Sequence, residues 1–324
     1  MLKDIFTLLN DTTFRELDMY DPFTKLNKLK EKRNAVILAH YYQDPDIQDA
    51  ADFLGDSLAL AQVAQKTDAD VILFCGVHFM AETAKILNPE KTVLRPDVEA
   101  GCSLADSAPP DEFEKWVNKY SDHTVISYIN CSAQVKALSD IICTSSNAEK
   151  ILNSLPANEK IIFAPDQLLG SYLMKKTGRN LRLWHGTCQV HEIFSERELV
   201  RLKIRYPIAK VLAHPECTEA ILQHADIIGS TTRIINYAAE SVDEIFLIAT
   251  EPGVIHQMEL KIPDKKYIPV PNQEGCACNE CPYMRLNTID KMIYSLTNNT
   301  HEITMSESLR NSALKPLIKM LELS

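Results

Sequence analysis

Three sets of polar residues recur along this chain with the same two spacings. His40, Tyr128 and His214 are separated by 88 and 86 residues. Two further sets keep both steps, namely Tyr42, Asn130 and Glu216, and Ser57, Ser145 and Thr231. Apolar residues align at the same offsets, for example Ile37, Val125 and Val211. Coincidence is the alternative explanation, but it would not extend one pair of offsets to polar and apolar positions together. We therefore predict three copies of one structural unit.

Short apolar runs alternate with helical patterns along the chain. The runs are rich in Val and Ile and cover residues 35–40, 70–76, 124–130, 160–166, 209–214, 225–231 and 244–250. Helical patterns occupy residues 57–66 and 80–87, and a third begins at Ser195, where Glu198 completes a capping-box pattern. Apolar strands separated by helices are typical of parallel sheets built from β-α-β units. The predicted fold class is α/β, with three pseudo-symmetric α/β/α sandwich domains whose short parallel sheets surround a central active site.

The length of 324 residues also exceeds that of one ordinary domain. We expect the following division: a helical extension at 1–25, α/β domains at 26–108, 109–194 and 195–290, and a C-terminal helical segment at 291–324 that packs back on the domains.

Charge and missing motifs exclude several classes of protein. The net charge is −10, which is the wrong sign for a protein that neutralises nucleic-acid phosphates. The glycine-rich phosphate loops G-x-G-x-x-G and G-x-x-x-x-G-K-[ST] do not occur. The N-terminal segment carries acidic residues where a signal peptide needs basic ones, and no run of 18 apolar residues follows. We expect a cytoplasmic protein with neither a nucleic-acid nor a membrane partner.

Three of the nine cysteines follow the repeat. Cys102 and Cys188 are 86 residues apart, and Cys281 comes 93 residues later, after an extended insertion. In a reducing compartment, spaced cysteines indicate metal binding or catalysis more than disulfides. Three thiolates leave one metal position open, and an iron–sulfur cluster with one unligated iron suits such a set. A zinc knuckle at Cys276, Cys278 and Cys281 is the simpler alternative, but a fourth ligand is not obvious. The remaining cysteines, Cys75, Cys131, Cys143 and Cys217, are expected to be small buried hydrophobes.

The repeated polar residues lie where ligands bind in parallel α/β sheets, beyond the carboxyl ends of the strands. Ser57, Ser145 and Thr231 are expected at helix starts, where hydroxyl and backbone N–H groups can hold carboxylate or phosphate. Asn130 can orient a carbonyl or carboxylate without charge. Acid–base groups that work near neutral pH come from His40, Tyr42, Tyr128, His191, His214 and Glu216. His78, His123, His224 and His256 are expected to be structural. The sequence thus predicts a small polyanionic substrate.

Nine motifs carry a resemblance to a known family. They are AHYYQ (39–43), GDSL (55–58), AGCSLAD (100–106), SYIN (127–130), CTSSNA (143–148), AHPEC (213–217), GSTT (229–232), ATE (249–251) and CPYM (281–284). In this order, over about residues 30–320, the chain resembles quinolinate synthase, an iron–sulfur enzyme of NAD biosynthesis. The resemblance implies a transferase of the EC 2.5.1 class. Its substrates would be iminoaspartate and dihydroxyacetone phosphate, which it would condense to quinolinate with loss of phosphate and two waters.

The resemblance also implies roles for individual residues. An oxygen-sensitive [4Fe-4S] cluster would be held by Cys102, Cys188 and Cys281, and its open iron would act as a Lewis acid. Many relatives have C-x2-C-x2-C where this chain has C-x-C-x2-C, which puts in doubt a redox disulfide between Cys276 and Cys278. Glu216 is expected to be the general base, assisted by Tyr42 and His40. The residues expected to hold carboxylates and phosphate are His214, Ser57, Ser145, Tyr128, Asn130 and Thr231, and His191 joins the substrate-contacting set.

Two other classes of function remain as alternatives. One is a zinc-binding regulatory module, and the other is an iron–sulfur electron carrier, which rarely needs a cavity ringed with His, Tyr, Ser and Glu. For the enzyme, functional coupling to an aspartate-oxidising enzyme is an expectation, because iminoaspartate is unstable.

Overall fold

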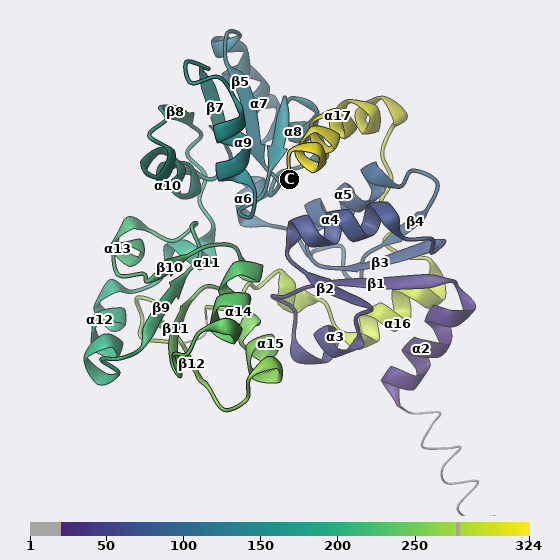
Figure 1. The fold of residues 1–324 in the computed structure, drawn as a ribbon. Helices are drawn as coiled ribbons and strands as arrows, with labels where there is room; N and C mark the ends of the chain where they lie inside the picture. Colours follow the sequence, from purple (N-terminus) through teal and green to yellow (C-terminus); the bar gives the residue numbers. More distant parts are fainter. Residues whose placement is uncertain (1–20, 277–278) are drawn as a thin grey trace, which may run out of the picture.

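The computed structural model describes residues 21–276 and 279–324. Its core consists of three separate four-stranded sheets, arranged around a common centre and flanked by helices (Figure 1). All strand pairs are parallel, and each sheet has the same order, with the second strand of the unit at one edge, followed by the first, third and fourth. The α/β class and the threefold repeat are therefore confirmed. Most of the N-terminal extension expected at 1–25, and Cys278, lie outside the described residues.

The first sheet is buried on both faces. Its strands, in spatial order, are β2 (Phe53–Gly55), β1 (Ala35–His40), β3 (Val71–Cys75) and β4 (Thr92–Leu94). Val36 and Leu38 pack with residues of α4 (Ser57–Lys66) and α5 (His78–Leu87). Ile37 and Ala39 pack on the opposite face, with residues of α2 (Pro22–Lys32), α3 (Pro45–Ala50) and α16 (Ile289–Asn298). Burial of alternate side chains on both faces explains the uninterrupted apolar run.

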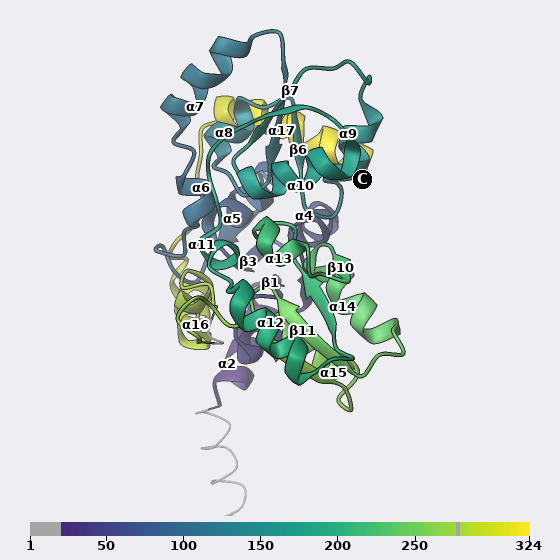
Figure 2. The same ribbon diagram turned by 90° about the vertical axis from the view of Figure 1, so that its left-hand side faces the viewer.

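The second sheet also packs against the C-terminal helix of the chain. Its strands are β6 (Ile141–Cys143), β5 (Thr124–Tyr128), β7 (Ile161–Ala164) and β8 (Leu181–Leu183). The helices of this unit are α6 (Ser103–Asp106), α7 (Pro110–Val117), η1 (Asn118–Tyr120), α8 (Ala133–Ala137), α9 (Ala148–Ser154) and α10 (Gln167–Thr177). Helix α17 (Glu307–Leu323) lies against α8 and β6, as Figures 1 and 2 show, and it buries Leu317 and Met320 in the core. The chain thus returns to the first two sheets after completing the third, although the domain limits stay a prediction.

The third sheet consists of β10 (Ile227–Ile228), β9 (Lys210–Ala213), β11 (Ile245–Ala249) and β12 (Lys266–Pro269). Its helices are α11 (Gln189–Glu192), α12 (Glu196–Arg205), α13 (Glu219–Leu222), α14 (Thr231–Glu240), α15 (Val254–Lys261) and the short η2 (Met284–Leu286). Ser195 caps α12 by accepting from the Glu198 N–H at 3.3 Å. The predicted capping box is only half right. The Glu198 carboxylate accepts from Arg197 and Arg201, while the Ser195 N–H donates to Pro271.

An aspartate that the sequence analysis missed occupies the same place in each unit. Its Oδ2 accepts the backbone N–H of the first strand of that unit, and its own N–H donates to the carbonyl of the same partner. The pairs are Asp52 with Ile37, Asp140 with Val125, and Asp226 with Val211, each with an N–H to Oδ2 distance of 2.8 Å. The aspartates also keep the spacings of 88 and 86 residues. Each unit therefore joins its edge strand to its central strand by the same local contact.

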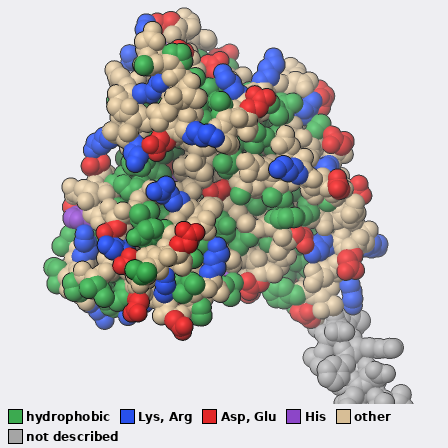
Figure 3. Space-filling view, in the orientation of Figure 1, with side chains coloured by type: hydrophobic (Ala, Val, Ile, Leu, Met, Phe, Trp, Pro, Cys, Tyr) green, Lys and Arg blue, Asp and Glu red, His purple; other side chains and the backbone are tan. Residues whose placement is uncertain are grey.

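The surface does not separate the two signs of charge on the face shown in Figure 3. Lys and Arg side chains are interspersed there with Asp and Glu side chains. Within residues 21–276 and 279–324, none of the helices combines the length and apolar character needed to cross a bilayer.

Candidate active site

One central cavity contains every residue that the sequence predicts for the site. The predicted residues that line it are His40, Tyr42, Ser57, Cys102, Tyr128, Asn130, Ser145, Cys188, His191, His214, Glu216, Thr231 and Cys281. Within the described part of the chain, the lining contains no Lys or Arg. An anion in this cavity would therefore be held by neutral donors. The chemical role of each residue stays a prediction.

The repeated residues reach the cavity from the ends of the strands, as the repeat in the sequence indicated. His40 ends β1, Tyr128 ends β5, and His214 directly follows β9. Ser57 and Thr231 are the first residues of α4 and α14. Ser145 is different, because it lies in the loop before α9, whose N-cap is Asn147. The expectation that Ser145 opens a helix was therefore wrong, although its side chain reaches the cavity.

The three predicted ligand cysteines share one local geometry. Cys102 and Cys188 are the N-caps of α6 and α11, and Cys281 lies just before η2. Near each sulfur are the backbone N–H groups two and three residues later in the chain, and these groups lower the pKa of the thiol. These donors are Leu104 and Ala105, Val190 and His191, and Tyr283 and Met284. Such donors favour the thiolate over the thiol.

Burial opposes the free thiolate at these cysteines. It raises the pKa of Cys102 to about 12 and the pKa of Cys188 well above its usual value. A metal ion replaces the thiol proton and removes this cost, while the N–H donors remain available to the bound sulfur. The three cysteines therefore fit a thiolate-ligated iron–sulfur cluster. By contrast, Cys75, Cys131, Cys143 and Cys217 are buried among apolar side chains, as predicted.

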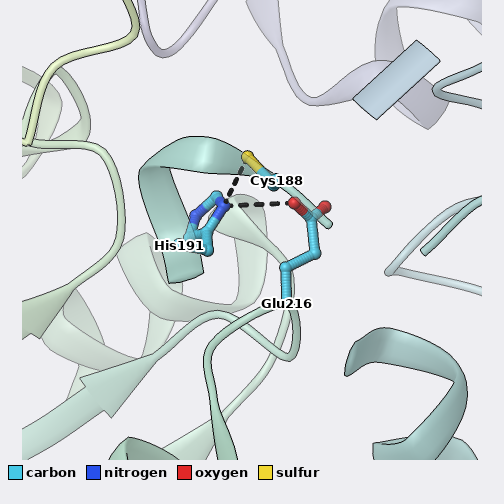
Figure 4. A group of neighbouring side chains, drawn as sticks. All are labelled: Cys188, His191 and Glu216. Atoms are coloured by element: carbon cyan, nitrogen blue, oxygen red, sulfur yellow. Dashed lines mark hydrogen bonds and ion pairs between the residues drawn. The ribbon is translucent and has the colours of Figure 1, made fainter. Parts of the chain in front are cut away.

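A chain of hydrogen bonds crosses the cavity wall from Tyr42 to Tyr128. Thr250 Oγ1 lies 2.8 Å from the Tyr42 hydroxyl and 3.0 Å from His191 Nε2. His191 Nδ1 lies 3.1 Å from Glu216 Oε2, and Figure 4 shows the ring facing both Glu216 and Cys188. The Tyr128 hydroxyl donates to Glu216 Oε1 at 2.5 Å. Thr250 was not predicted for the site, because it lies within the ATE motif but does not take part in the repeat.

The negative charge on Glu216 decides which group donates each hydrogen bond between Tyr42 and Glu216. Burial by itself would raise the pKa of Glu216, but His214, His191 and the Tyr128 hydroxyl lower it to about 2. The resulting carboxylate accepts a hydrogen bond from the Nδ1–H group of His191. His191 Nε2 then accepts from Thr250, whose oxygen accepts from Tyr42. The donors of this chain therefore run from the Tyr42 hydroxyl toward Glu216, and burial raises the pKa of Tyr42 well above its usual value.

Two histidines of the repeat present the same nitrogen to the cavity. Burial lowers the pKa of His40 to about 4 and that of His214 to about 3, so both rings are neutral near pH 7. The Tyr42 N–H donates to His40 Nδ1 at 3.2 Å, and the Glu216 N–H donates to His214 Nδ1 at 3.5 Å. The proton of each ring is therefore on Nε2. That nitrogen of His214 lies 3.3 Å from Ser145 Oγ.

Further polar groups complete the wall. Asn130 Oδ1 is buried and has no hydrogen-bond partner among the described residues, so it is available to a ligand. Asp56 and Glu251 also line this wall, and neither was predicted, although both lie in motifs that carry the family resemblance. Glu251 accepts from the Cys281 N–H at 3.2 Å and from Arg285 at 2.6 Å, which anchors the third cysteine. The four histidines expected to be structural, namely His78, His123, His224 and His256, lie outside the cavity and pair with carboxylates.

A second metal-binding arrangement overlaps this site. One ligand atom each from Cys188, His191 and Glu216 lies within 4.8 Å of the others. Mixed sulfur, nitrogen and oxygen donors of this kind are ligands that zinc accepts. Zinc is therefore the metal against which an iron–sulfur cluster has to be tested.

Comparisons with known proteins all lead to one enzyme family. A family model described as "Quinolinate synthetase A protein" matches residues 24–322. The chain is 60% identical over 304 residues to a quinolinate synthase of Microcystis aeruginosa, covering 94% of this chain and 95% of the relative. It is 61% identical over 309 residues to one of Chloroherpeton thalassium, covering 95% and 96%. A Nostoc punctiforme quinolinate synthase is 58% identical over 314 residues, with 97% of each chain covered.

Proposed function

Because this chain belongs to the quinolinate synthase family, an enzyme family of NAD biosynthesis, we propose that it condenses iminoaspartate with dihydroxyacetone phosphate. The product is quinolinate, and phosphate and two waters are released, which is a reaction of the EC 2.5.1 class. The observation that carries the proposal is the meeting of all three repeats in one cavity that combines three thiols, neutral anion-holding groups and a hydrogen-bond chain to Glu216.

Cys102, Cys188 and Cys281 hold a [4Fe-4S] cluster in this proposal. Their paired backbone donors support the assignment, since these compensate buried thiolate charge. When bound, the cluster supplies Lewis acidity at its one iron without a protein ligand.

Neutral groups hold the substrate anions. His40 and His214 point Nε2–H donors into the cavity, and Ser57, Ser145 and Thr231 add hydroxyls from three units. The unpartnered Asn130 Oδ1 adds an acceptor. A lining without Lys or Arg suits a substrate whose phosphate must leave, because tight ionic binding of the phosphate product would slow its release.

Glu216 and Tyr42 carry the proton transfers. Glu216 is the ionised base at one end of the chain of hydrogen bonds, and Tyr42 is the hydroxyl at the other end, which passes a proton toward Thr250 and His191 as it takes one from the substrate. Positioned bases of this kind contribute about 100-fold or more to proton transfer. His40 lies against the Tyr42 ring, with 4.5 Å between the ring centroids, and assists at the same wall.

The decisive experiment is anaerobic purification followed by a visible spectrum and assays of iron, sulfide and zinc. Four iron and four sulfide per chain, with formation of quinolinate and phosphate from the two substrates, is the expected result. Stoichiometric zinc without sulfide would instead indicate a zinc-binding regulatory module, consistent with the Cys188, His191 and Glu216 group. A cluster that passes electrons without forming quinolinate would indicate an electron carrier.

The cellular setting of the enzyme is part of the same proposal. We expect the protein in the cytoplasm, where thiols stay reduced, together with an aspartate-oxidising enzyme that supplies the unstable iminoaspartate.

A further inference from the structure

A single carboxylate joins all three units of the repeat. Asp56 Oδ2 accepts from the Ser146 hydroxyl and from the Thr232 hydroxyl, both at 2.8 Å. Asp56 itself belongs to the first unit, Ser146 to the loop before α9 in the second, and Thr232 to α14 in the third. Its other oxygen, Oδ1, caps α4 by accepting the Ala59 N–H at 3.0 Å. We call the cluster of Asp56, Ser146 and Thr232 the clasp.

The clasp is next to the hydroxyls that the repeat brings to the cavity. Ser57 follows Asp56 in the chain, Ser145 precedes Ser146, and Thr231 precedes Thr232. Each cavity hydroxyl is thus one peptide bond away from a clasp residue. Since no backbone hydrogen bond is shared between these three segments, the clasp is the direct polar contact that fixes their spacing.

The position of the clasp also matters for access to the cavity. Asp56 and Ser145 line the central cavity and also an outer groove between α4, α10 and α14. Other groove residues, such as Arg233 and Asn236, are exposed, so the groove opens to solvent. The clasp therefore lies between the cavity and solvent, at the boundary where the three units meet.

We infer that Asp56 is a positioning residue, which closes the three units around substrate and sets the spacing of the Ser57, Ser145 and Thr231 hydroxyls. This inference rests on the proposed function, because it assigns those hydroxyls to substrate anions. A carboxylate suits this place, because Asp56 is only 7% exposed and accepts three hydrogen bonds from three separate donors. An amide oxygen could accept from both hydroxyls, but its NH2 group would then face the Ala59 N–H, and the cap of α4 would be lost.

The test removes the donors and leaves Asp56 as the helix cap. The protein tested is the full chain loaded with its cluster. The double variant Ser146→Ala with Thr232→Val loses the two hydrogen bonds that Asp56 Oδ2 accepts from the other two units. We expect KM for the two substrates to rise about tenfold or more with kcat within threefold, because the hydroxyls bind the ground state and the transition state alike. Hydrogen exchange of the first turns of α4 and α14 should also become faster. The iron and sulfide content should stay unchanged.

Matched controls separate a specific effect from general destabilisation. The control Ser154→Ala with Thr297→Val also removes one serine and one threonine hydroxyl bond, each within a single helix away from the groove. It should match the native protein. Thr232→Ser keeps the hydroxyl and should behave as the native protein, whereas Thr232→Val alone should shift KM. This single pair decides the matter if the double variant does not fold.

The outcomes are distinct. KM and exchange rates equal to those of the control would overturn the inference, and so would a fall in kcat with KM unchanged. If the native protein forms no quinolinate, the proposed function fails instead. The exchange measurement, which needs no turnover, then decides whether the clasp holds the three units together.

Discussion

The Tyr128 hydroxyl donates to Glu216 Oε1 at 2.5 Å, across the boundary between the second and third units of the repeat. The two residues are 88 apart in the chain and come from different positions of the repeat, since Tyr128 ends β5 and Glu216 follows β9 by three residues. The contact therefore exists only when two units are assembled. It joins the base of the proposed reaction to the opposite wall of the cavity.

Replacing Glu216 by Gln tests that base. The amide keeps the shape of the side chain but cannot take a proton from His191, so we expect turnover to fall about 100-fold or more. The visible absorption of the cluster should be unchanged, because Glu216 is not one of the three proposed ligands. Near-native turnover of the Glu216→Gln variant would remove Glu216 from the mechanism.

Thr250 provides a test of the chain between Tyr42 and Glu216. Thr250→Val keeps the volume of the side chain but removes the hydroxyl that links Tyr42 to His191, so kcat should drop about 100-fold. Thr250→Ser keeps the hydroxyl and should retain most activity. Equal rates for the Val and Ser variants would show that the proton does not pass through residue 250. Nitrogen-15 shifts of the His191 ring give a second readout, because loss of the Thr250 donor should move the Nε2 resonance while Nδ1 stays bonded to Glu216.

The cysteine assignment is tested by Cys102→Ala. Loss of one of three thiolate ligands should abolish the brown absorption, the bound iron and sulfide, and quinolinate formation together. Cys143→Ala is the matched control, because Cys143 is fully buried in the core and should affect only stability. A Cys102→Ala protein with full iron and sulfide would exclude this residue as a ligand.

Acid sensitivity should depend on Glu82, which joins α5 to the second unit by accepting the Ala133 N–H at 3.0 Å. Burial tends to raise the pKa of Glu82, but His78, Lys136 and that N–H lower it below the ordinary value of 4.5. Glu82 therefore stabilises the fold above its unfolded pKa, and this contribution is lost as the pH falls through the lower folded pKa.

Urea unfolding of Glu82→Gln can measure this effect. We expect the variant to be less stable than the native protein at pH 7, and the difference to shrink as the pH falls below about 4. Glu90→Gln, at an exposed position, is the control and should follow the native protein at every pH. A constant difference between Glu82→Gln and the native protein from pH 7 to pH 3 would contradict the prediction.

The apolar pattern of the sequence predicted the interior strands of the three sheets but not most of the edge strands. The central strands β1, β3, β5, β7, β9 and β11 were predicted, because burial on both faces makes them continuously apolar. Among the edge strands only β10 was predicted, whereas β2, β4, β6, β8 and β12 were missed. Most of these have three residues, and their pairing depends on a neighbouring strand more than on their own apolar content.

The α/β class, the threefold repeat and the repeated residues around the cavity follow from the amino-acid sequence, because each unit places its polar residues at the same strand ends. Tertiary structure decided which of these residues touch. Thr250 links Tyr42 to His191, and Asp56 joins Ser146 to Thr232. The repeat spacing puts Ala164 and Gly76 in place of Thr250, and Thr144 and Ser230 in place of Asp56, so neither side chain is repeated. Periodicity reveals what the units share. Contacts between units depend on where they differ, so only the assembled fold could show them.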